Sequence, residues 1–192
     1  MPENFKKEDL RVEKTLKAIQ EALLTLLERR NFKRITVNAL CEEAQICRAT
    51  FYTHFKDKYD LLEFCLTNIN RKIMMSIDDD NSKNCNQLER TANQLIRENK
   101  KIISNIVKNA NDETVELLYA FMLSFLDIAE KKDEDGEFSQ RYIVLSNFCV
   151  GGMMKFLLWQ IENEFPQDFK WNHYISMLIH ILAWEAGQDY KG

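Results

Sequence analysis

Hydrophobic residues recur at intervals of three and four along most of this chain, the spacing typical of helices that bury one side. The first such segment runs from about Leu10 to Arg30, and its apolar stripe comprises Val12, Leu16, Ile19, Leu23, Leu26 and Leu27. Polar breaks separate further helices, which we expect near residues 37–44, 48–55, 58–77, 86–109, 112–130, 137–163 and 170–187.

Glycine and proline are too scarce for most other architectures. No glycine precedes Gly136, and the prolines are Pro2 and Pro166. Phosphate-binding loops of nucleotide enzymes need closely spaced glycines, and sheet proteins need frequent glycine or proline turns. The sequence therefore predicts an all-α fold, and it excludes a dinucleotide-binding or P-loop motif from the first two-thirds of the chain.

Composition and charge are those of a soluble globular protein. Of 192 residues, 45% are hydrophobic and 29% are charged, with a net charge of −4. Residues 1–60 contain 12 Lys and Arg against 10 Asp and Glu, so this part is slightly basic and the rest is acidic. The N-terminus lacks the apolar core of a signal peptide, and the apolar stretch 142–161 carries Lys155. We therefore expect a cytoplasmic protein without a membrane span.

The segment from Ile35 to Leu62 carries the clearest functional pattern. Thr36 is placed to cap a short helix, and after a tight break a second short helix begins at Arg48. Two short helices joined in this way form a helix-turn-helix. Phe51 and Phe55 lie four residues apart, so they turn one side of the second helix inward. The other side then carries Arg48, Ala49, Tyr52 and Thr53, with Thr50 and His54 at its edges, a set of donors and methyl groups suited to DNA.

This segment resembles the TetR family of bacterial transcriptional regulators over about residues 16–66. The resemblance rests on Ile35–Thr36, Ala44, Ile46, the block Thr50-Phe51-Tyr52-Thr53-His54-Phe55, Lys58 and Leu61–Leu62. It implies a three-helix DNA-binding domain at residues 1–57, followed at residues 58–192 by a helical bundle for dimerisation and possible ligand binding. It also implies a homodimeric regulator, usually a repressor, that binds a pseudo-palindromic operator in double-stranded DNA.

The resemblance assigns roles to individual residues. Those that match residues holding DNA phosphates are Thr36, Tyr52, His54 and Lys58. Those at positions facing bases in the major groove are Arg48, Ala49, Thr50 and Thr53. Among these last four, only the arginine can bind guanine O6 and N7 together.

Two positions depart from the family pattern. Gln45 stands where the family usually has a turn glycine, so we expect a left-handed backbone at an unfavourable residue. Cys47 stands where the family often has a serine cap, and a thiol is a poorer acceptor. Cys47 is either a simple replacement for serine or a redox-active thiol.

A second part of the resemblance concerns dimerisation. Phe148, Gly151, Gly152 and Trp159 are similar to the dimerisation region of one TetR subgroup. Two glycines inside a helix are unfavourable unless another helix approaches closely, and a local kink is the alternative explanation. The residues that we expect at the dimer interface are Gly151, Gly152, Trp159, Trp171 and Leu178.

Other functions stay open beside DNA-binding repression. One is a helical interaction protein whose N-terminal domain has lost DNA binding, and another is an activator that works with a partner protein. A helical enzyme has no support, because no HExxH, GxSxG or paired-carboxylate motif occurs. We expect no cofactor and no metal, and a small-molecule effector would bind within residues 86–192.

Overall fold

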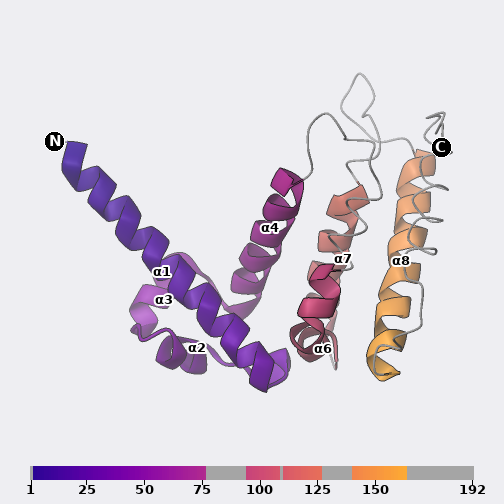
Figure 1. Cartoon of the computed structure of the whole chain (residues 1–192), viewed down its shortest axis with the longest axis horizontal. Helices are drawn as coiled ribbons and strands as arrows, with labels where there is room; N and C mark the ends of the chain where they lie inside the picture. The colour runs from indigo at the N-terminus through magenta and orange to yellow at the C-terminus, as the bar shows by residue number, and fades with distance from the viewer. Residues whose placement is uncertain (1, 77–93, 109, 127–139, 164–192) are drawn as a thin grey trace. The chain divides into compact units, whose positions relative to one another are not determined.

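The computed structural model describes residues 2–76, 94–108, 110–126 and 140–163, and every regular element among them is helical (Figure 1). In chain order these are α1 (Pro2–Arg29), the 3-10 helix η1 (Phe32–Arg34), α2 (Val37–Glu43), α3 (Arg48–His54), α4 (Lys58–Ser76), α6 (Lys100–Val107), α7 (Asp112–Leu126) and α8 (Gln140–Glu162). The all-α prediction is confirmed for this part of the chain. The helix expected at residues 170–187 lies outside the described residues.

The chain divides into two compact units. The first comprises residues 1–66 and 101–114, and the second comprises residues 67–100 and 115–192. The later segment belongs to the first unit because side-chain amides tie it to α1 and η1. Asn105 Nδ2 donates to the carbonyl of Leu27 at 2.7 Å, and Asn31 Nδ2 donates to the carbonyl of Lys108.

The core of the first unit lies between α1, α2, α3 and the start of α4. Helix α2 packs against α1, and α3 packs against α2 (Figure 1). The fully buried large side chains of this core are Ile19, Leu23, Leu26, Leu27, Phe32, Ile35, Leu40, Phe51, Leu61 and Leu62. Because these residues come from α1, η1, α2, α3 and α4, their burial fixes the place of α3.

Two expected boundaries are wrong, for different physical reasons. Helix α1 begins at Pro2 rather than near Leu10, since polar residues continue it beyond its buried stripe; Val12 is 39% exposed. The helix expected over residues 86–109 is interrupted at Asn99. The backbone N–H and side-chain Nδ2 of Asn99 both donate to the carbonyl of Leu95, at 3.1 and 2.9 Å, and α6 begins after this turn.

In the second unit, α8 has two unlike sides. Its buried residues are Ser146, Cys149, Val150 and Met154. In contrast, Val144 is 70% and Phe148 is 77% exposed, so the helix also presents large apolar side chains to solvent. Across from α8, Tyr119 of α7 donates its hydroxyl to the carbonyl of Asn147 at 2.8 Å.

No helix in the described ranges combines the length and the apolar character needed to cross a membrane. The two domains expected at residues 1–57 and 58–192 stay a prediction.

Candidate nucleic-acid interface

Helices α2 and α3 and the turn between them form the predicted helix-turn-helix. The motif begins at the N-terminus of α2. There the N-cap residue Thr36 accepts a hydrogen bond on Oγ1 from the Ala39 amide at 3.2 Å. This is the capping role that the sequence predicts, and it satisfies one of the amides that a helix N-terminus leaves open.

The turn after α2 is closed by two backbone hydrogen bonds. The Ile46 amide donates to the carbonyl of Cys41 at 3.0 Å, and the Gln45 amide donates to the carbonyl of Glu42 at 3.2 Å. These two bonds define a Schellman motif, which requires a left-handed residue just after the helix. Gln45 occupies that position with φ of 55°. The expectation of a positive φ at Gln45 is therefore confirmed.

Helix α3 starts without a side-chain cap. Cys47 has the extended backbone of an N-cap residue, with φ of −80° and ψ of 157°, but its side chain makes no capping bond to the helix amides. Its exposed Sγ lies 3.1 Å from Thr50 Oγ1. The hydrogen bond with Thr50 lowers the pKa of the Cys47 thiol below its usual value. The prediction that Cys47 caps poorly is confirmed.

Two phenylalanines hold the inner side of α3. Phe51 is fully buried and Phe55, at the end of the helix, is nearly so. Their ring centroids are 5.7 Å apart, and Phe55 packs edge-on against Phe64 of α4 at 5.3 Å. This aromatic cluster packs the inner side of α3 against α4, and the burial of both phenylalanines is as their four-residue spacing predicts.

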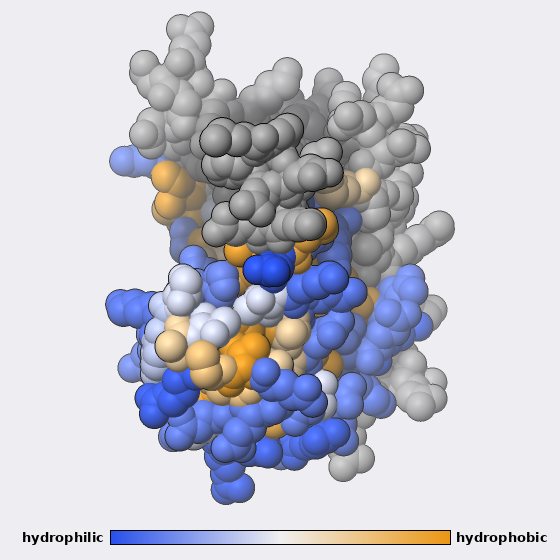
Figure 2. All heavy atoms as spheres, turned by 90° about the vertical axis from the view of Figure 1, so that its left-hand side faces the viewer, coloured by the Kyte–Doolittle hydropathy of each residue, from blue (hydrophilic) through white to orange (hydrophobic). Residues whose placement is uncertain are grey.

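The outer side of α3 collects the residues predicted to read DNA. Arg48, Ala49, Tyr52 and Thr53 are exposed, and Thr50 and His54 are half-buried at the edges. Figure 2 shows the side of the molecule on which α3 lies, and its described part is mostly hydrophilic around a small hydrophobic area. The structure thus brings all six residues onto one short, solvent-facing helix.

Arg48 is held in place on this surface. Its Nη2 donates to the hydroxyl of Tyr52 at 3.3 Å, and its guanidinium carbon lies 5.7 Å from the centre of the Tyr52 ring. The tyrosine therefore limits the rotamers of the arginine and leaves other guanidinium donors available. Thr53 donates its hydroxyl to the carbonyl of Ala49 at 2.9 Å, which also orients that side chain.

Lys58 is placed differently from the other predicted phosphate-binding residues. Its Nζ donates to the backbone carbonyls of Phe32, Lys33 and Ile35, at 3.0, 3.2 and 3.0 Å. Burial lowers the pKa of Lys58, and the carboxylates of Glu113 and Asp57 oppose that change. The ammonium has three N–H donors, and all three are used within the protein. The predicted phosphate contact of Lys58 stays untested, and this geometry does not favour it.

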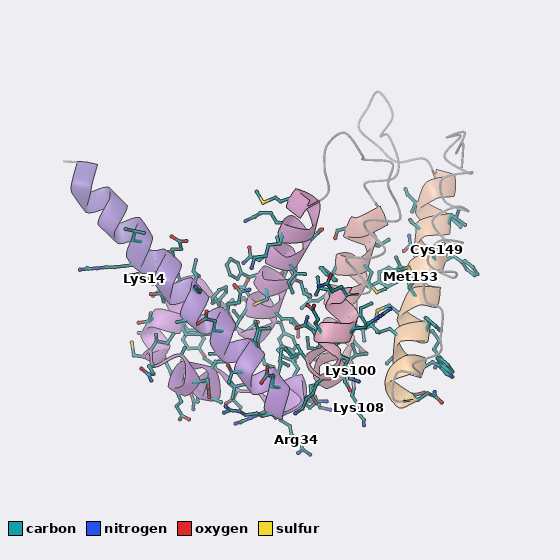
Figure 3. The ribbon with its side chains drawn as sticks, viewed as in Figure 1. Lys14, Arg34, Lys100, Lys108, Cys149 and Met153 are labelled. Atoms are coloured by element: carbon teal, nitrogen blue, oxygen red, sulfur yellow. The ribbon has the colours of Figure 1, made fainter. Side chains whose placement is uncertain are left out.

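Two exposed cations lie outside α3. Arg34 on η1 and Lys14 on α1 both extend away from the ribbon (Figure 3) and are exposed. Arg34 lies two residues before Thr36, so it adds positive charge near the start of α2. Neither residue belongs to the motif on α3, which is why the pattern of the sequence did not single them out.

The predicted dimer residues lie partly within the described residues. Gly151 and Gly152 are exposed on α8, and a Cβ atom added to either would meet nothing within 4 Å. Trp159 stacks on Phe156 with ring centroids 5.7 Å apart. Trp171 and Leu178 lie outside the described residues. Among the residues that are described, no three side chains gather as a metal site would require.

Comparison with known sequences points to one family. Residues 19–65 match the model for bacterial regulatory proteins of the tetR family. The chain is also 39% identical over 62 residues to an uncharacterized HTH-type transcriptional regulator, YxbF, of Bacillus subtilis (strain 168). That match covers 32% of this chain and spans only 16% of the length of the relative.

Solved structures resemble the chain over most of its length. A TetR transcriptional regulator from Streptococcus agalactiae 2603V is 15% identical with a TM-score of 0.63, covering 92% of this chain and 98% of that one. The dihydroxyacetone kinase operon activator DhaS is 17% identical with a TM-score of 0.56, covering 90% and 96%. A TetR regulator from Rhodococcus sp. RHA1 is 14% identical with a TM-score of 0.55, covering 93% and 99%. At these identities the likeness establishes a shared fold.

Proposed function

We propose that the chain regulates transcription by binding double-stranded DNA through the outer side of α3, on the premise that residues 19–65 match the model for bacterial regulatory proteins of the tetR family. The observation that carries this proposal is the solvent-facing set on α3, in which the Tyr52 hydroxyl and ring orient the guanidinium of Arg48. A helix of this width fits the major groove of DNA, where the pattern of donors and acceptors differs for each base pair.

The proposed contacts divide into two groups. Arg48, Ala49, Thr50 and Thr53 face base edges, with Arg48 binding a guanine and the methyl groups meeting thymine methyls. Thr36, Tyr52 and His54 hold phosphates, which set the register of α3 in the groove. Lys58 is left out of this second group, because its donors are occupied.

We propose that the chain acts as a homodimer on an inverted repeat. Two copies of α3 related by a two-fold axis would enter successive major grooves. The exposed apolar side of α8, with Val144, Phe148, Gly151 and Gly152, supports this proposal, because a glycine pair with open space above it lets a second helix approach closely.

Repression by excluding polymerase is the outcome we propose. A small molecule bound within residues 86–192 would relieve it by favouring a dimer whose two α3 helices no longer match the groove spacing. The alternative that the same surface serves an activator working with a partner protein predicts an operator upstream of the promoter instead of across it.

The proposal is tested by selecting fragments that the purified protein retains from random duplex DNA at low salt. We expect an inverted repeat, and we expect Arg48→Ala to relax the preference at one position of each half-site by about 1–3 kcal/mol. Arg34→Ala is the matched control, since it removes an exposed arginine outside α3 and should leave all base preferences unchanged. Failure to enrich any duplex, or unaltered base discrimination in Arg48→Ala, would refute the proposal.

A further inference from the structure

We propose that Lys58 is a positioning residue of the DNA-binding unit, which holds the link between α1 and α2 in place, and that it does not bind a phosphate itself. The link consists of η1 and Ile35 and leads directly into Thr36. The part of this proposal that concerns DNA rests on the proposed function, whereas the part that concerns the link stands on the protein alone.

The first observation is the set of acceptors around the ammonium. The three carbonyls that receive its hydrogen bonds belong to Phe32, Lys33 and Ile35, within four consecutive residues of the chain. Backbone carbonyls at the end of a short 3-10 helix have few partners in the helix itself. One side chain from α4 thus binds the carbonyls of Phe32, Lys33 and Ile35 and fastens η1 to the start of α4.

The second observation is the aromatic enclosure of the same ammonium. Nζ lies 4.8 Å from the ring centre of Phe32 and 5.2 Å from that of Tyr59, and these two rings meet edge-on at 5.4 Å. Phe32 is fully buried. The two rings cover part of the half-buried Lys58 side chain, and a phosphate would have to compete with the three carbonyls for its ammonium.

The third observation is that the start of α4 already holds an anion. The Asp57 carboxylate accepts hydrogen bonds from the amides of Tyr59 and Asp60 at 2.8 and 3.0 Å. A helix N-terminus attracts phosphate through such amides and through its dipole. Here the carboxylate occupies the amides and adds a negative charge, so neither the helix end nor Lys58 offers a phosphate site.

The role of Lys58 is therefore exerted through Thr36. The carbonyl of Ile35, which Lys58 holds, immediately precedes Thr36, and the Ile35 amide donates to the carbonyl of Phe32 at 3.0 Å. Thr36 in turn caps α2 through the Ala39 amide. Removal of the ammonium takes the Lys58 donor from the carbonyls of Lys33 and Ile35, while the carbonyl of Phe32 keeps the Ile35 amide. This frees the link and loosens the start of α2.

The experiment compares Lys58→Met, Lys58→Arg and the unaltered protein, with Lys56→Met as the matched control. Lys56 lies two residues away and is exposed, and its side chain takes no part in this arrangement. Hydrogen exchange of the Ile35 and Ala39 amides is measured without DNA, and the salt dependence of DNA binding is measured on the selected operator.

We expect Lys58→Met to accelerate exchange of both amides by at least about tenfold and to weaken DNA binding at every salt concentration with an unchanged salt slope. Lys58→Arg should also accelerate exchange, because a planar guanidinium cannot direct three donors to the same three carbonyls. Lys56→Met should leave exchange unchanged. If Lys58→Met fails to fold, the exchange rates of Lys58→Arg decide the question.

A phosphate role would give the opposite results. The salt slope would then fall by about 0.9 in Lys58→Met, exchange would stay at the unaltered rates, and Lys58→Arg would bind DNA normally. Unchanged exchange in both variants overturns the positioning role by itself. A protein that binds no DNA refutes the proposed function only, since the exchange measurement still tests the link.

Discussion

Replacing Gln45 by glycine should stabilise the helix-turn-helix. Gln45 has a φ of 55° at the residue that follows the α2 cap, where the Schellman motif demands a left-handed backbone. A side chain with a Cβ atom pays roughly 1–2 kcal/mol for that conformation, because Cβ crowds the following carbonyl oxygen. Glycine has no Cβ, so Gln45→Gly removes this cost from the folded state.

The expected gain is smaller than the strain it removes. Glycine also increases the freedom of the unfolded chain, which costs about 0.4–1 kcal/mol of stability. The net gain therefore lies between about 0 and 1.6 kcal/mol, and its midpoint is about 0.8 kcal/mol. For a chain of this length, that corresponds to an increase in Tm of about 1–4 °C.

Urea unfolding followed by circular dichroism measures this gain as a higher midpoint with an unchanged slope. Exchange of the Ile46 amide, which donates to the carbonyl of Cys41, reports on the turn itself and should slow down. Gln45→Ala is the control, because it keeps Cβ and the strain and should stay within about 0.5 kcal/mol of the unaltered protein. If the glycine variant were no more stable than the alanine variant, the backbone of Gln45 would not be strained.

Two further results are expected. Iodoacetamide should alkylate the exposed Cys47 well before Cys65, because the hydrogen bond with Thr50 lowers the pKa of Cys47 whereas burial raises the pKa of Cys65 to about 12. The alkylation rate at Cys47 should therefore rise at a lower pH than the rate of an ordinary thiol. Equal labelling of the two cysteines in mass spectrometry would contradict this order. Gly152→Leu should shift the sedimentation profile towards the monomer without loss of helicity. Leucine favours the helix by about 1 kcal/mol relative to glycine, and a Cβ at this position meets nothing within 4 Å in the chain itself. A sedimentation profile identical to that of the unaltered protein would place the dimer contact elsewhere.

The local features of the helix-turn-helix were predictable from sequence because each depends on residues only a few positions apart. The burial of Phe51 and Phe55 follows from their four-residue spacing, and the cap at Thr36 follows from a hydroxyl before a helical segment. The positive φ at Gln45 was expected from the resemblance, because the family usually has glycine at this turn. Features of this kind depend mainly on neighbouring residues in the chain and little on the rest of the fold.

The features that were missed depend on residues far apart in the chain. Lys58 donates hydrogen bonds to carbonyls 23 to 26 residues earlier in the chain. The spacing of residues within α4 gives no sign of these partners. Asn105 and Asn31 look like ordinary surface residues in the sequence, yet each ties segment 101–114 to the first unit. Partners of this kind are decided by tertiary packing, which a single sequence does not display.

The discontinuity of the first unit also bears on how the protein is made. Residues 1–66 leave the ribosome first, but the segment that Asn105 and Asn31 hold against α1 is translated only after a further 34 residues, 67–100. The nascent chain can therefore form the helix-turn-helix early, whereas the complete unit must wait for residue 114 to emerge. Until then the surface of α1 that receives α6 stands open to cellular chaperones.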